Sequence, residues 1–102
     1  MGSLSREVIR RYIRRHLTEF RYCYEQQLIR NPQLAGRVVI RFVIGRDGRV
    51  TAAAVATSTL GSEPAQQCMV TAMNRISFPA IDGGGVVIVN YPFSFQPAPP
   101  AR

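Results

Sequence analysis

Apolar residues recur every three or four positions between Ser5 and Arg30, and this spacing predicts an amphipathic helix. The apolar stripe contains Ile9, Ile13, Leu17, Phe20, Tyr24 and Leu28, with His16, Cys23 and Gln27 beside it. Ser5 is suited to cap the first turn, and Asn31-Pro32 ends the helix because a residue before proline avoids helical backbone angles. We therefore expect one long continuous helix that buries this stripe.

Residues 37–44 alternate with a period of two, which is typical of a half-exposed strand. One face of this strand carries Val38, Ile40, Phe42 and Ile44. The other face carries Arg37, Val39, Arg41 and Val43. The pair Asp47-Gly48 follows, and such a pair supplies the positive backbone angles that a tight reversal requires. The pattern therefore predicts a hairpin.

A second strand is predicted from about Val50 to Thr57. In a regular strand Val50 and Val55 would point to opposite faces, because the distance between them is an odd number of residues. Either a bulge shifts the register between these two valines, or one of them faces outward.

A second helix and a third strand complete the chain. Ser62-Glu63-Pro64 is a typical helix start, and Phe78-Pro79 is expected to end the helix. The buried stripe of this helix is predicted to be Ala65, Cys68, Met69, Ala72 and Ile76. The flexible connection 82–85 leads to residues 86–95, whose β-branched and aromatic side chains favour a strand.

These elements predict an α+β fold with the order α-β-β-α-β. A right-handed crossover through the second helix would place the third strand beside the first, giving a three-stranded antiparallel sheet of order 2-1-3 with both helices on one face. The third strand would be an edge, which suits Pro92 because proline lacks a backbone donor. We expect a single domain over residues 5–96, a cloning remnant at 1–4 and a flexible proline-rich tail at 97–102.

The chain is strongly basic, with 13 arginines, no lysine and 6 acidic residues, for a net charge of +7. This balance favours polyanionic partners, among them acidic peptides, anionic lipid and nucleic acid. The basic helix face carries Arg10, Arg11, Arg14 and Arg15; we interpret it as a solvated face, the alternative being contact with anionic lipid or an acidic partner. No apolar run is long enough to span a membrane, and the first residues do not form a signal peptide.

Candidate chemistry is sparse. A cysteine nucleophile would need an orienting third group and an oxyanion hole, and the sequence predicts neither. His16, Cys23 and Cys68 could supply three zinc ligands, with Asp82 or water as the fourth, but the spacing matches no standard zinc motif. The glycine loop precedes a strand rather than a helix, so it is not expected to bind phosphate. We therefore expect no enzyme, no cofactor, no metal and no small-molecule substrate.

The third strand is the predicted site for a partner. Tyr91, Phe93 and Phe95 are assigned to the core, which leaves Val86, Ile88, Val39 and Val43 on the sheet face that no helix covers. The predicted binding edge consists of Val86, Val87, Ile88, Val89, Asn90, Tyr91, Pro92, Phe93 and Ser94. Arg37 and Arg41 beside it would select an acidic or polar peptide. A second copy of the chain is an alternative occupant, and an arginine-driven nucleic-acid-binding module is the alternative function.

Several motifs resemble those of a known family, and they occur in the same order. They are Leu34-Ala35-Gly36-Arg37-Val38, Asp47-Gly48-Arg49-Val50, Ser58-Thr59, Phe78-Pro79 and Gly83-Gly84-Gly85. Together they make residues 24–95 similar to a TonB-type C-terminal domain. Further motifs resemble the subgroup at the C-terminus of myxobacterial AgmX/PglI gliding-motility proteins, namely Cys23-Tyr24-Glu25, residues 31–38, residues 58–61, Cys68 and residues 91–95.

The resemblance implies a periplasmic module of an inner-membrane-anchored envelope protein, with a membrane tether upstream. Its partner would be an outer-membrane or wall-associated protein or peptide, because TonB domains capture a peptide as a strand beside their third strand. Two positions differ from energy-transducing TonB proteins, which have Tyr-Pro where this chain has Tyr24-Glu25 and tryptophan where it has Ile76.

The implied compartment bears on the two cysteines. Cys23 and Cys68 belong to helices that would pack side by side, and a disulfide between them suits an oxidising compartment. Closing a loop of roughly 46 residues would stabilise the fold by about 4 kcal/mol in the chain-entropy model. The implied compartment favours the disulfide, and we therefore predict this pair; the alternative is two small buried thiols.

Overall fold

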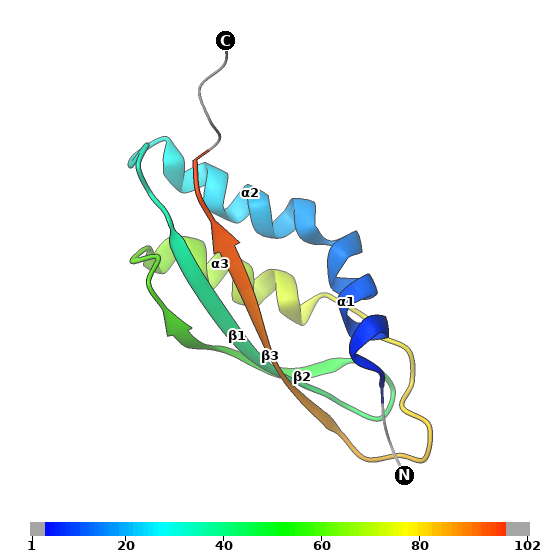
Figure 1. Cartoon of the computed structure of the whole chain (residues 1–102). Coiled ribbons are helices and arrows are strands. Elements are labelled where there is room, and N and C mark those ends of the chain that lie inside the picture. The colour runs from blue at the N-terminus through cyan, green and yellow to red at the C-terminus, as the bar shows by residue number, and fades with distance from the viewer. Residues whose placement is uncertain (1–3, 98–102) are drawn as a thin grey trace.

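A computed structural model describes residues 4–97 (Figure 1). The elements are α1 (Arg6–Arg15), α2 (Leu17–Leu28), β1 (Gly36–Ile44), β2 (Val50–Ser58), α3 (Glu63–Asn74) and β3 (Val87–Phe95). The strands form one antiparallel sheet in the order β2-β1-β3, so the predicted α+β fold and topology are confirmed. Leu4 packs against the core, whereas residues 1–3 and the predicted tail beyond Pro97 lie outside the described residues.

The first helix is broken at His16, so the expectation of one continuous helix was wrong. His16 leaves helical geometry with a ψ of 7°, and its Nδ1 lies 2.6 Å from Glu19 Oε2 in the first turn of α2. The break has a physical reason in packing. The ring centroid of Tyr12 in α1 lies 6.0 Å from that of Phe78, whereas Phe20 of α2 stacks on Phe93 of β3. Figure 1 shows that α1 and α2 run in different directions, and a straight helix would not follow both surfaces.

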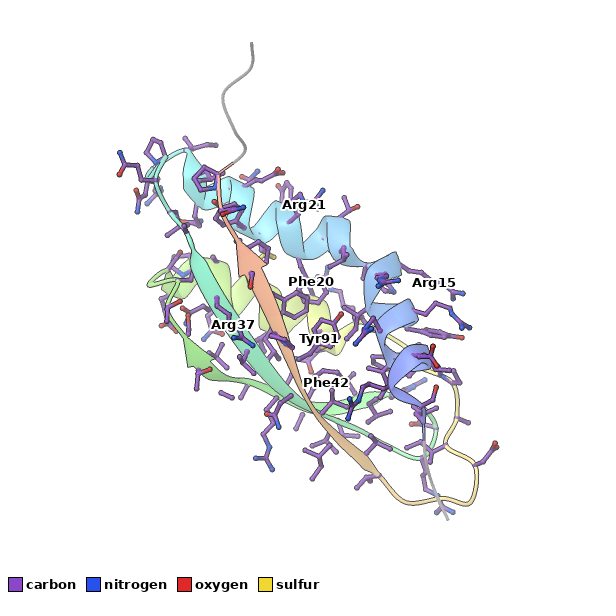
Figure 2. All side chains as sticks on the ribbon, in the orientation of Figure 1. Arg15, Phe20, Arg21, Arg37, Phe42 and Tyr91 are labelled. Carbon is purple, nitrogen blue, oxygen red and sulfur yellow. A yellow bond between two sulfur atoms is a disulfide. The ribbon has the colours of Figure 1, made fainter. Side chains whose placement is uncertain are left out.

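The core lies between the sheet and the helices. Val38, Ile40, Phe42 and Ile44 of β1 are fully buried, as the alternation predicted, and Figure 2 shows Phe42 under the helical layer. Phe20 stacks on Phe93 with ring centroids 4.5 Å apart. These contacts hold β1 and β3 against the helices.

β2 contains two bulges, which answers the question about its valines. Its register on β1 shifts once at each end, and Thr51 and Ala56 are left without partners. As a result Val50 pairs with Ile44 and Val55 pairs with Ile40, and both valines lie on the face that packs on the core.

α3 ends at Asn74, earlier than the predicted stop at Phe78-Pro79. Ile76 and Phe78 remain buried, but in an extended segment whose Phe78 N–H donates to the Gly48 carbonyl at 2.9 Å. Gly48 has a φ of 90°, and a Cβ there would lie only 1.9 Å from the Phe78 carbonyl oxygen. The hairpin turn therefore binds this segment and ends the helix before the proline does.

Candidate functional site

The outer side of β3 is an open sheet edge. β3 pairs with β1 in an unbroken register from Gly36 opposite Phe95 to Ile44 opposite Val87, and no other strand among residues 4–97 pairs with it. Val86 is 61% exposed and Ile88 is 54% exposed. An unpaired edge with exposed apolar side chains at one end invites pairing with another chain.

The two faces of β3 are divided as the sequence predicted. Phe93 is buried, and Tyr91 and Phe95 are half-buried against the core. Figure 2 shows Tyr91 and Phe20 between β3 and the helical layer. The residues that point away from the helices are exposed, namely Ile88, Asn90, Pro92 and Ser94. Val39 and Val43 of β1 lie on this same helix-free face and are half-exposed.

Two open grooves follow β3 on its helical side, and the sequence did not predict them. One, of about 550 Å³, lies between α2 and residues 91–96 and is lined by Leu17, Arg21 and Leu28 among others. The other, of about 500 Å³, lies between α1 and residues 87–92 and is lined by Leu4, Arg6, Ile9 and Arg10 among others. A strand added to β3 would place every second side chain over these grooves.

Positive charge surrounds the edge. Arg37 and Arg41 are exposed on β1, opposite Ser94 and Asn90 of β3 respectively. Arg6, Arg10 and Arg21 line the grooves, where Glu25 is the single acidic residue. Within residues 4–97 the ion pairs are His16 with Glu19 and Arg49 with Asp47, so none of these five arginines has a carboxylate within 4.0 Å in that part of the chain.

The predicted basic helix face divides into two parts. Arg10, Arg11, Arg14 and Arg15 are all exposed. Arg10, however, lines the groove beside β3, whereas the Arg15 guanidinium lies 4.6 Å from the centre of the Tyr12 ring (Figure 2). Only part of this arginine run is therefore near the candidate edge.

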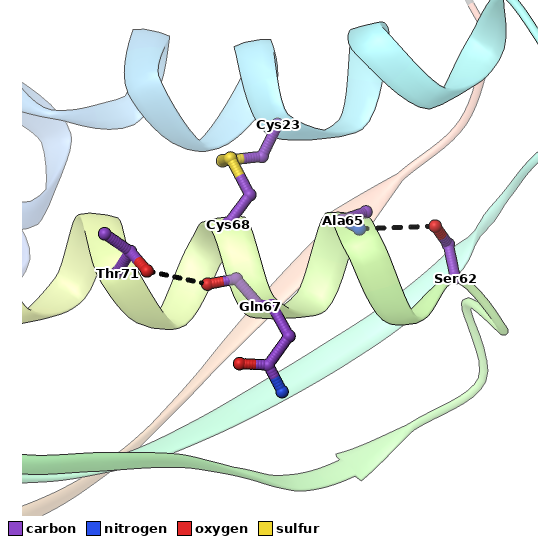
Figure 3. The surroundings of a disulfide bond; sticks show 6 residues. All are labelled: Cys23, Ser62, Ala65, Gln67, Cys68 and Thr71. Carbon is purple, nitrogen blue, oxygen red and sulfur yellow. Dashed lines mark hydrogen bonds between the residues drawn. A yellow bond between two sulfur atoms is a disulfide. The ribbon is translucent and has the colours of Figure 1, made fainter.

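Cys23 and Cys68 form a disulfide that joins α2 to α3, with an S–S distance of 2.05 Å and Cα atoms 5.6 Å apart (Figure 3). This confirms the predicted pair and excludes the two-thiol alternative. Cys68 is half-exposed in a groove of about 460 Å³ between the two helices. A disulfide is typical of proteins that fold in oxidising, extracytoplasmic compartments.

The zinc hypothesis loses its two sulfur ligands, because both cysteines are in the disulfide. Nowhere in the described chain do three His, Cys, Asp or Glu side chains gather closely enough to hold a metal ion. None of its helices has the length and apolar character needed to cross a membrane.

Tyr24 is a buried polar group with a structural role. Its hydroxyl donates to the Leu34 carbonyl oxygen, and its ring stacks on Phe95 with centroids 5.0 Å apart. Burial raises the pKa of Tyr24 above its ordinary value, and the nearby charge of Glu25 raises this pKa further. The interaction ties α2 both to the segment before β1 and to the end of β3.

No protein-family model, curated protein or solved structure matches the chain. The candidate site is therefore defined by the geometry of β3, by its two grooves and by the arginines around them.

Proposed function

We propose that this domain is a non-catalytic interaction module of the cell envelope, located in the periplasm, that binds an extended segment of a partner by strand addition at β3. The observation that carries the proposal is the edge of β3 itself. Its register with β1 is unbroken and its outer side is unpaired among residues 4–97. It has the exposed Ile88 on one face and open grooves on the other.

Strand addition uses the chemistry that such an edge offers. The outward N–H and C=O groups of β3 can pair with an incoming backbone, except at Pro92, which has no N–H to donate. This pairing supplies affinity without regard to sequence. The alternating side chains of the ligand then contact the grooves on one side and the exposed residues of β3, such as Ile88 and Pro92, on the other. The ligand gains burial on both faces, which a loop lying on a flat surface would not.

Two further observations support the periplasm and a protein partner. The Cys23–Cys68 disulfide suits an oxidising compartment. The motifs that resemble TonB-type C-terminal domains lie at the start of β1, in the hairpin turn, at the end of β2 and in the segments that follow α3 and precede β3. The members of that family add a peptide beside their third strand. An inner-membrane anchor upstream and an outer-membrane or wall-associated partner follow from the same resemblance.

Titration of the ¹⁵N-labelled chain with extended peptides of about ten residues tests the proposal. Amide shifts are expected along residues 86–95 and not along β2, which is the internal control because it forms the other edge of the same sheet. The competing function is arginine-driven binding of nucleic acid, whose affinity falls steeply with salt because counterions are released. Steep, salt-sensitive binding of DNA or RNA without peptide shifts along β3 would overturn the proposal.

A further inference from the structure

The helix-free face beside β3 carries a regular pattern of charge that specifies a ligand. We infer that the edge selects an acidic strand of another protein, with two carboxylates four residues apart on its helix-free side and an apolar residue between them. This inference rests on the proposed strand addition and adds the chemistry of the partner.

The pattern comes from the exposed side of β1, where arginine and valine alternate. Arg41 lies opposite Asn90 and Arg37 lies opposite Ser94, whereas Val39 lies opposite Pro92. The two arginines are four residues apart on one face, which in a strand corresponds to about 13 Å. Glutamates at i and i+4 of an added strand have the same spacing, since a strand repeats its faces every two residues.

The arginines are able to act across β3. An added strand would lie two strand spacings, about 10 Å, from β1. An arginine and a glutamate that extend toward each other bridge such a gap, provided that the residue between them is small. Asn90 and Ser94 stand in these two places, and both are short and exposed.

The helical side of the edge has the same sign of charge. Arg6, Arg10 and Arg21 line its grooves against the single carboxylate of Glu25. Among residues 4–97 no acidic side chain lies within ion-pair distance of these three arginines or of Arg37 and Arg41. A charge-assisted bond to a carboxylate of the ligand is therefore open to each arginine, and a basic strand would be repelled.

The occupant is another protein rather than a second copy of this chain. The six acidic residues are Glu7, Glu19, Glu25, Asp47, Glu63 and Asp82, and no two of them are four residues apart. A second copy would also bring its own net charge of +7 to a positively charged edge. Neither the spacing nor the charge of the chain fits its own edge.

Three synthetic strands of equal length test the inference by the ¹⁵N titration. The first has Glu at i and i+4 with Val at i+2, the second replaces both Glu by Gln, and the third has Glu at i and i+2. We expect the first to bind about fivefold more tightly than the second, as two exposed ion pairs would give, and the third to fall between them.

Matched variants of the protein assign the preference to β1. The double substitution Arg37→Gln and Arg41→Gln should abolish the preference for the first peptide over the second. The control variant Arg11→Gln with Arg15→Gln removes the same amount of charge from α1, away from both grooves. This variant should retain the preference for the first peptide over the second.

The outcomes separate the two proposals. Equal binding of all three peptides along residues 86–95 would overturn the acidic pattern and leave strand addition standing. Equal binding of the first and third peptides would show that total charge and not spacing matters, which also overturns the inference. If none of the peptides shifts the β3 amides, strand addition itself fails, and the inference fails with it.

Discussion

At one edge of the sheet β3 keeps an unbroken register with β1, whereas at the other edge β2 leaves Thr51 and Ala56 without partners on β1. Bulges bend a strand and interrupt its ladder, so they hinder the addition of another strand. The same sheet therefore has one edge with a protective device and one edge without it.

The side chains of the two edges differ in the same sense. Outward positions of β2 carry small residues such as Ala52 and Ala54, whereas β3 exposes Ile88 beside the exposed Val86. At the end of β2 the Ser58 hydroxyl donates to Gln66 Oε1 of α3 at 2.7 Å, whereas the helices beside β3 leave two grooves open. Apart from Pro92, which removes one backbone donor, β3 lacks the protections found on β2, and it is therefore the edge where a partner is to be expected.

The largest expected effect concerns the disulfide, which couples the helix over β3 to the helix over β2. Cys23→Ala with Cys68→Ala should lower the free energy of unfolding by about 4 kcal/mol, because the denatured chain gains the freedom of an opened loop. Urea unfolding followed by circular dichroism measures this loss. Amide exchange would show whether β2 and β3 still open together. If the free energy of unfolding falls by less than about 1 kcal/mol, the disulfide does not hold α2 and β3 to α3 and β2.

The second prediction concerns the anchoring of the two edge strands. Phe93→Ala should destabilise the fold by about 3 kcal/mol, because the ring is buried and stacks on Phe20. Val55→Ala on β2 should cost about 1 kcal/mol, since this side chain is only half-buried. Equal costs in urea unfolding would remove the distinction between an aromatic anchor on β3 and a weakly anchored β2.

Tyr24, which holds the end of β3 through Phe95, gives a smaller effect with a pH signature. Tyr24→Phe should cost about 1 kcal/mol, the usual contribution of a hydrogen bond. The pKa of Tyr24 is raised in the folded state by burial and by Glu25, so the unfolded chain releases this proton first as the pH rises. The wild type should lose stability above about pH 10, and the phenylalanine variant should lose less.

Measuring unfolding at several pH values between 8 and 11 therefore tests both parts of the prediction for Tyr24. The phenylalanine variant is its own control for the other tyrosines and the arginines, because it contains all of them unchanged. If the two proteins lose stability in parallel above pH 10, burial of Tyr24 does not govern the slope.

Local patterns in the sequence predicted most of the fold. The alternation in residues 37–44 predicted β1, and the right-handed crossover predicted the sheet order. The cap at Ser62 predicted the start of α3, and the compartment that the resemblance implies favoured the disulfide. The break at His16 was missed because the apolar stripe continues through it, and only the packing of the two halves on different surfaces reveals it. The early end of α3 also depends on a distant contact, that of Phe78 with Gly48.

The candidate edge was predictable from its alternation and from Pro92, but its grooves were not. Leu17 and Leu28 lie on the stripe that was expected to be buried, yet they line an open groove beside β3. How closely a helix approaches a sheet edge depends on the sizes of side chains from several elements, and no local pattern records that. The positions of Arg10 and Arg21 beside the edge were missed for the same reason.

The smallest expected effect on stability comes from a change that would make the two edges alike. Ala56 is an unpaired residue between Val55, which pairs with Ile40, and Thr57, which pairs with Val39. Deleting Ala56 would leave these pairs in place and give a regular alternation, because Val55 already faces the core and its new neighbour faces outward. The free energy of unfolding should change by less than about 1 kcal/mol, since no buried side chain is lost.

The consequence of this deletion should appear in association rather than in folding. With one bulge removed, residues 52–58 form a straight edge of small side chains, which is open to pairing with a second molecule. Sedimentation should show concentration-dependent dimers for the deletion variant, and its β2 amides should be protected from exchange. The control variant Ala56→Gly keeps the bulge and should sediment as the wild type does. If the deletion variant sediments as the wild type at every concentration, the bulge does not protect β2. The difference between the two edges would then have to come from the exposed Ile88 and the grooves of β3, because β2 has neither.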